Sequence, residues 1–148
     1  MLLALAEDDD GEVHVLLTVR SDNLRTNPGE VACPGGKREK DDASDWHTAL
    51  RESFEEIQLP PDQVRFVAQL DSFCTNFGVL VTPFVGLIPF SFKAVPSPSE
   101  VKFVFWVPLK VFLVDNPAVH KVYILGLVLP FAFCSHVPLP PNTGALVV

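Results

Sequence analysis

The sequence predicts an α/β fold in which helices, one of them amphipathic with an acidic face, pack on a mixed β-sheet, within a single domain of 148 residues. Two patterns indicate this. Apolar and polar residues alternate before and after the segment 46–59, as they do in strands, whereas within that segment the apolar residues recur at helical spacing. A chain of this length is long enough to enclose one hydrophobic core.

The N-terminal part reads as a strand hairpin followed by a glycine loop. Residues 1–6 are mostly apolar, the acidic segment 7–11 ends in a glycine and forms a turn, and residues 13–19 alternate in polarity. The polar segment 21–30 is a loop, and Val31–Cys33 is a short strand that enters the glycine loop.

Further strands are expected beyond the helix, which Pro60-Pro61 ends. They cover 64–70, 79–88 and 101–107; the second is longer and more buried and is interrupted by Pro83. The proline-rich segment 90–99 is a loop. Leu109–Val114 starts a helix that Pro117 ends, and the apolar run 122–134 is too short to span a membrane.

The helix has an apolar side and an acidic side. Asp41, Asp42, Ser44 and Asp45 supply the chemistry of a helix start. At 100° per residue, one side carries Trp46, Leu50, Ser53, Phe54 and Ile57, and the opposite side carries Glu52, Glu55 and Glu56. The apolar side is expected to face the core.

Carboxylates this close repel one another, so a bound cation would explain Glu52, Glu55 and Glu56. Mg²⁺ prefers such oxygen ligands and also accepts phosphate oxygens from a substrate. The preceding glycines, Gly35 and Gly36, let the backbone approach closely. The alternative is a solvated acidic face on which Arg51 pairs with Glu55 at i, i+4.

The charge distribution argues against electrostatic binding of nucleic acid, because the formal net charge is −7. Positive residues nevertheless gather between positions 20 and 51, where they offer phosphates a local basic surface or serve as ordinary solubilising charges. They are Arg20, Arg25, Lys37, Arg38, Lys40 and Arg51. No histidine shows metal-ligand spacing.

The three cysteines, Cys33, Cys74 and Cys134, contain no C-x-x-C pair. This pattern indicates a reducing, intracellular compartment and no zinc site. Cys74 is expected to be a buried thiol.

The segment 36–59 resembles the Nudix box, G-x5-E-x7-R-E-U-x-E-E-x-G-U, through Gly36 and Arg51-Glu52-x-x-Glu55-Glu56. The runs 16–36, 80–86 and 100–109 resemble one Nudix subgroup, the coenzyme A pyrophosphatases. Gly36 and Arg51 lie one residue further apart than in the general box, so its first glutamate falls on Asp42 or Ala43. Ser53 replaces an apolar residue, and Gln58 replaces a glycine that would take φ > 0.

The resemblance implies a Nudix α/β/α sandwich with a mixed sheet, with a late N-terminal start and a divergent C-terminus that leave the fold's completeness open at both ends. The Nudix domain would cover residues 1–113, with the box at 36–59. Residues 114–148 would form a divergent segment whose order the sequence leaves open.

The resemblance also implies metal-dependent hydrolysis of coenzyme A or its thioesters to 3′,5′-ADP and (acyl-)4′-phosphopantetheine, with Mg²⁺ or Mn²⁺. The implied metal ligands are Glu52, Glu55, Glu56 and the carbonyl of Gly36, and Arg51 would orient the carboxylates. The implied substrate contacts are Arg20, Arg25, Gly35, Gly36 and Lys37. Glu100 is either a water-activating base or an exposed loop acid.

Two other functions stay open: a Nudix hydrolase of another nucleoside diphosphate-linked substrate, and a truncated, catalytically inactive Nudix-like binding protein. Substrate comparison separates the first, and metal-dependent stabilisation without turnover would indicate the second. A peroxisomal location follows from the resemblance only, because Ala145–Val148 is not an S-K-L-type address. The oligomeric state is not predicted.

Overall fold

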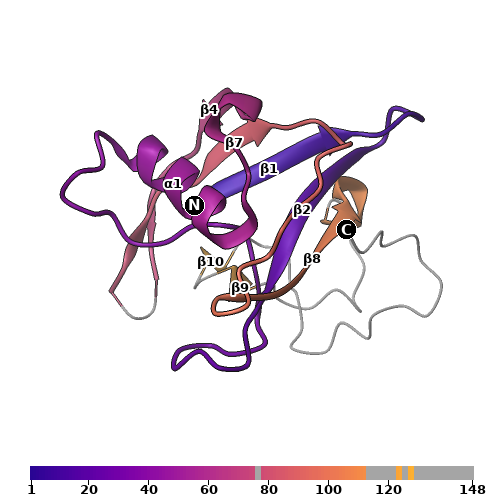
Figure 1. Ribbon diagram of the computed structural model, residues 1–148. Coiled ribbons are helices and arrows are strands. Elements are labelled where there is room, and N and C mark those ends of the chain that lie inside the picture. Colours follow the sequence, from indigo (N-terminus) through magenta and orange to yellow (C-terminus); the bar gives the residue numbers. More distant parts are fainter. Residues whose placement is uncertain (76–77, 113–122, 125–126, 129–148) are drawn as a thin grey trace.

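The computed structural model describes residues 1–75, 78–112, 123–124 and 127–128 and is built on one six-stranded mixed sheet. Figure 1 shows this sheet with helix α1 (Asp45–Ile57) beside it. The strand order is β3-β2-β1-β7-β4, with β8 also paired to β2. Their bounds are β1 Leu2–Glu7, β2 Val13–Arg20, β3 Val31–Ala32, β4 Arg65–Gln69, β7 Phe84–Leu87 and β8 Val101–Pro108.

Shorter elements complete the described part. Helix α1 covers Asp45–Ile57, and two 3₁₀ turns cover Pro61–Gln63 (η1) and Leu109–Phe112 (η2). One two-stranded sheet joins β5 (Phe73–Cys74) to β6 (Leu80–Val81), and another joins β9 (Tyr123–Ile124) to β10 (Leu127–Val128). Among the described residues, no helix is both long enough and apolar enough to cross a membrane.

The predicted α/β class and mixed sheet are confirmed. Strand β1 runs antiparallel to β2 but parallel to β7, and the other pairs of this sheet are antiparallel. The predicted N-terminal hairpin is β1–β2, in which Leu5 pairs with Val15. The second helical layer of a sandwich is not found among the residues that the structure describes.

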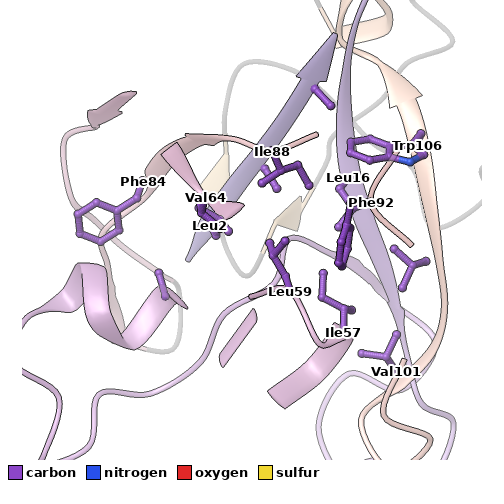
Figure 2. Packing of buried hydrophobic residues seen from close by; sticks show 14 residues of the cluster. Leu2, Leu16, Ile57, Leu59, Val64, Phe84, Ile88, Phe92, Val101 and Trp106 are labelled. Atoms are coloured by element: carbon purple, nitrogen blue, oxygen red, sulfur yellow. The ribbon is translucent and has the colours of Figure 1, made fainter. Parts of the chain in front are cut away.

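Strand β2 is buried on both faces, so His14 and Thr18, the polar residues of its alternating pattern, are buried as well. Leu16 belongs to a cluster that also contains Ala49 and Ile57 of α1, whereas Val15 and Leu17 belong to a second cluster. Figure 2 shows the first cluster, where Ile57 and Leu59 lie close to Leu16 of β2. Full burial of one such aliphatic side chain contributes about 1.5–3 kcal/mol, so α1 is held firmly against the sheet.

The predicted division of α1 into an apolar and an acidic side is wrong at two positions, Phe54 and Glu56. Phe54 is 50% exposed, while Ser53 is fully buried and Glu56 is only 8% exposed. The helix packs through Ala49, Ser53 and Ile57, residues spaced at i, i+4 and i+8, and Ser53 satisfies its hydroxyl by donating to the Ala49 carbonyl at 2.7 Å. Glu56 lies beside this row, so it is buried with it.

The expected single strand over 79–88 is also wrong. Pro83, which has no N–H to donate, separates β6 from β7, and the two strands belong to different sheets. Strand β6 is not buried, since Leu80 is 69% exposed. Cys74 of the partner strand β5 is exposed as well, so the expectation of a buried thiol is corrected, whereas Cys33 is buried.

The other expected strands are confirmed at β3, β4 and β8, and the segment 90–99 forms no strand or helix. Of the helix expected over 109–114, the described residues show the 3₁₀ turn η2. The domain boundary at residue 113, the segment 114–148 and, apart from β9 and β10, the apolar run 122–134 lie outside the described residues.

Both ends of α1 are capped as the sequence suggests. The Ser44 hydroxyl accepts the His47 backbone N–H at 3.3 Å. At the other end Gln58 takes the left-handed conformation, with φ 56° and ψ 34°, and its N–H donates to the Phe54 carbonyl at 2.9 Å. A glycine adopts this conformation without the steric cost of a Cβ.

Gln58→Gly is therefore expected to raise the free energy of unfolding by about 0.5–1 kcal/mol, measured by urea denaturation. Gln63→Gly is the matched control, because Gln63 lies in η1 and takes no left-handed conformation. Gln63→Gly should leave stability unchanged or lower it. Equal effects of the two variants would contradict the assignment of strain to Gln58.

Candidate active site

The glycine loop lies directly against two carboxylates of α1. The Gly35 N–H donates to Glu56 Oε2 at 3.3 Å. A Cβ built on Gly36 would stand 2.4 Å from the carboxyl carbon of Glu52, closer than any side chain tolerates. Gly35 has φ 149°, and a Cβ there would stand 2.7 Å from the Met1 Cα. Only glycines therefore permit this contact.

Glu52 and Glu56 are held away from water. The Glu52 side chain is 17% exposed and Glu56 is 8% exposed. Burial raises the pKa of Glu56 to about 8, the Gly35 N–H opposes this shift, and the charges of Glu52 and Glu100 add to it. Burial also raises the pKa of Glu52, against the neighbouring Arg51.

Arg51 is engaged by other partners. It forms ion pairs at 3.0 Å with each of Asp42, Glu52 and Glu55, and its Nη2 donates to the Lys37 carbonyl at 2.9 Å. The pairing expected of a solvated face, Arg51 with Glu55, is thus present, and the Glu55 side chain is 50% exposed. The three acidic residues of the box are therefore not equivalent: Glu55 points outward, while Glu52 and Glu56 lie beneath the loop.

The sequence left open whether the first glutamate of the box corresponds to Asp42 or to Ala43, and in the structure Asp42 is the residue that pairs with Arg51. Its carboxylate accepts from Arg51 Nε at 3.0 Å, Arg51 Nη2 at 3.1 Å and Thr48 Oγ1 at 2.9 Å. Arg51 holds the pKa of Asp42 well below its usual range. Counting from Gly36 in the box would have found this residue, and counting from Arg51 would have given Ala43 instead.

The residues predicted to contact phosphate differ in how deeply they are buried. Arg20 is partly buried, and its charge lowers the pKa of Glu56. Arg20 Nη2 donates to the Thr26 carbonyl at 3.3 Å, but its buried Nε has no hydrogen-bond partner within the described residues. The Lys37 side chain is exposed. Arg25 is exposed in the loop after β2. Among the described residues, no recorded contact joins it to the acidic cluster.

Glu100 is brought to this site by backbone hydrogen bonds. The N–H groups of Val95 and Ser97 donate to the last carbonyls of α1, those of Ile57 (3.0 Å) and Glu56 (2.8 Å). The Ser21 N–H donates to the Glu100 carbonyl at 2.8 Å. The Glu100 side chain is exposed, and its charge contributes to raising the pKa of both Glu52 and Glu56.

This donor set fits a divalent cation. The carboxylates of Glu52, Glu56 and Glu100 repel one another. Arg51 is already paired with Asp42, Glu52 and Glu55, so Glu56 has no direct cationic partner among the described ion pairs. Hard oxygen ligands of this kind suit Mg²⁺ or Mn²⁺. A cation there would remove the repulsion that raises these pKa values.

A second acidic group lies at the turn between β1 and β2. Ligand atoms of Asp8, Glu12 and His14 lie within 4.8 Å of one another, close enough to hold a metal ion. These groups already have partners, because Lys110 pairs with Glu12 and His14 Nδ1 lies 3.1 Å from the Glu12 carbonyl. The sequence did not indicate this cluster, since its histidine has no ligand spacing.

Comparison with known proteins gives the family. The sequence matches the NUDIX domain family over residues 2–125. It is 48% identical over 103 residues to the mouse peroxisomal coenzyme A diphosphatase NUDT7, covering 70% of this chain and 44% of that protein. It is 39% identical over 127 residues to the Caenorhabditis elegans peroxisomal coenzyme A diphosphatase ndx-8, covering 84% and 53%. The chain thus spans about half the length of these relatives.

Solved structures agree on the fold. A Nudix hydrolase from M. smegmatis, RenU, superposes with a TM-score of 0.61 at 23% identity, over 72% of this chain and 67% of that one. A C. elegans Ap4A hydrolase superposes with a TM-score of 0.62 at 18% identity, over 74% and 78%. At these identities the similarity concerns the fold.

Asp42→Asn is expected to lower the melting temperature at pH 7, because it removes the charge that pairs with Arg51. Asp42 has a folded-state pKa below its ordinary 3.8, so its contribution is complete well above that value and declines as pH falls below it. The difference between parent and variant should therefore shrink below about pH 4. Asp41→Asn, at the exposed neighbour, is the control, and equal loss in both variants would contradict the pairing.

Proposed function

The chain belongs to the NUDIX domain family, and from this premise we propose that it hydrolyses the pyrophosphate bond of coenzyme A or its thioesters. The products would be 3′,5′-ADP and 4′-phosphopantetheine or its acyl form. The observation that carries the proposal is the pair of carboxylates directly beneath a glycine loop, of which Glu56 is buried and Glu52 partly buried. The names of the mouse and worm relatives supply the substrate.

Glu52 and Glu56 would hold the cation, and Glu55 and the Gly36 carbonyl would be further ligands; the Gly36 backbone lies against the Glu52 carboxylate. A bound Mg²⁺ or Mn²⁺ would polarise the phosphoryl oxygens and lower the pKa of water. Arg51 and Asp42 act indirectly: Asp42 pairs with Arg51, and Arg51 in turn pairs with the Glu52 carboxylate and fixes its position. The peptide N–H of Gly35 fixes Glu56 in the same way.

Arg20 is the most suitable phosphate contact. Its buried Nε lacks a partner within the described residues, and burying such a donor is costly unless a ligand accepts from it. A pyrophosphate oxygen would satisfy it, and the planar guanidinium suits a phosphate group. Lys37 and Arg25 are exposed and would add longer-range attraction for the negatively charged substrate. Gly35 and Gly36 would line the path to the carboxylates.

Glu100 would accept the proton of the attacking water. Its charge acts on Glu52 and Glu56 from a different element, and its carboxylate is exposed to solvent, unlike theirs. The hydrogen bonds from Val95 and Ser97 to the end of α1 keep this loop in place. A general base must reach the water that it deprotonates, and the effect of the Glu100 charge on the other two carboxylates supports this role.

The proposal extends to location. The names of the mouse and worm relatives include the peroxisome, and we propose the same compartment for the protein that carries this chain.

Glu56→Gln is expected to lower kcat for coenzyme A by about a hundredfold, equivalent to about 2.7 kcal/mol of barrier, because a neutral amide binds a cation poorly. The parent chain should melt at a higher temperature when Mg²⁺ or Mn²⁺ is added at pH 8, and the variant should not. Turnover is followed by chromatography of 3′,5′-ADP, and folding is checked by circular dichroism.

Glu39→Gln is the control for this experiment, because Glu39 is an exposed glutamate in the loop that follows Gly36. It should keep both turnover and metal-dependent stabilisation. ADP-ribose and a dinucleoside polyphosphate are assayed in parallel. A folded parent that binds the metal but hydrolyses none of these substrates would overturn the enzymatic proposal and favour a binding protein.

Glu100→Gln is expected to lower kcat at least tenfold, within the range that a lost general base produces, and to leave metal-dependent stabilisation intact. Loss of the metal-dependent rise in melting temperature would instead show that Glu100 is a metal ligand, and unchanged kcat would exclude both roles.

A further inference from the structure

A hollow of about 360 Å³ lies between the turn after β2 and the segment that leads into β8. Pro96, Pro98 and Val101 form its apolar wall, and Asn23 and Lys102 contribute polar groups. We propose that this hollow binds the nucleoside of the substrate and that Lys102 contacts a phosphate monoester on its ribose. This inference rests on the proposed function, since it concerns the recognition of the same substrate.

The hollow is linked to the candidate active site through Ser21. Ser21, which lines it, directly follows Arg20, whose charge acts on Glu56. The Ser21 N–H donates to the Glu100 carbonyl at 2.8 Å, and the Ser21 hydroxyl donates to the Pro98 carbonyl at 3.2 Å. A ligand whose pyrophosphate lies at Glu52 and Glu56 could therefore extend past Arg20 into this hollow.

The composition of the walls suits a nucleoside. Ligand pockets typically have volumes of about 300–1,000 Å³ and combine apolar walls with a few polar groups. The rings of Pro96 and Pro98 offer an apolar surface to the face of a base, and the Asn23 amide can both donate and accept hydrogen bonds. Val101 is buried in the core beneath α1, so this wall is fixed by the fold.

Lys102 is the cation of this hollow, and its present partner is easily replaced. Its ammonium lies 2.7 Å from the Asp22 carboxylate, and both side chains are more than half exposed (51% and 64%). Such exposed pairs contribute little stability, so a dianionic phosphate monoester would compete well for the ammonium. Arg51, Arg38 and Lys110 are by contrast paired with acidic groups elsewhere.

The test compares coenzyme A with dephospho-coenzyme A, which lacks only the ribose 3′-phosphate. For Lys102→Met, the ratio of kcat/KM for the two substrates, coenzyme A over dephospho-coenzyme A, should fall about fivefold, the effect of one exposed charge contact. Asp22→Asn should raise the same ratio, because it frees Lys102. Lys93→Met is the matched control, since Lys93 lines a different hollow at the C-terminal end of α1, and its ratio should be unchanged.

Binding of 3′,5′-ADP and 5′-AMP to the full chain, measured by calorimetry, separates this inference from the proposed function. The preference for 3′,5′-ADP should fall about fivefold in Lys102→Met even if no hydrolysis is found. The inference is overturned if Lys102→Met changes the two nucleotides equally, or neither of them, while the parent still hydrolyses coenzyme A. Absence of hydrolysis with an intact Lys102 effect would instead contradict only the proposed catalytic activity.

Discussion

The close approach of the Gly35-Gly36 backbone to α1 is the constraint on which the site depends. A Cβ at Gly36 would overlap the Glu52 carboxylate, and the Gly35 N–H is the hydrogen-bond donor to Glu56. The contact is possible because α1 is pressed onto the sheet through Ala49, Ser53 and Ile57, of which two are small. Packing of the helix therefore determines how deep its carboxylates lie.

Depth and charge oppose each other at these carboxylates. Burial makes the ionised form of Glu56 unfavourable, and Glu52 and Glu100 add repulsion. The fold does not relieve this with a dedicated counterion, because Arg51 is held by Asp42, Glu52 and Glu55. The unfavourable interactions thus remain at one point of the surface, where a cation can remove them, as is common for functional sites.

Sequence patterns predicted those elements whose environment is uniform along their length. The strand β2 and the capping residues of α1 were found from local properties, the alternation of polarity and the chemistry of the caps, whereas the burial of β2 on both faces was not predicted. The box glutamates, Arg51 and the glycines were also found from the sequence, because their spacing along one helix and one loop already implies proximity.

Other features depend on tertiary contacts that no local pattern records. Phe54 is apolar yet exposed, because Ser53 and Glu56 occupy the side of α1 that the sheet covers. Asp42 could be identified as the partner of Arg51 only when the loop's path was known. The approach of Glu100 to the box likewise arises from backbone hydrogen bonds to the end of α1.

Pro83 divides the structure into the main sheet and a separate arm. The strands β5 and β6 pair only with each other within the described residues, and the arm meets the main sheet at its base, where the Leu70 N–H donates to the Pro83 carbonyl and the Met1 amine donates to the Thr82 carbonyl. Changes of length or sequence in this arm would leave the register of β7 and the position of α1 unaltered. The arm is therefore the part of the fold in which insertions are tolerated at the smallest structural cost.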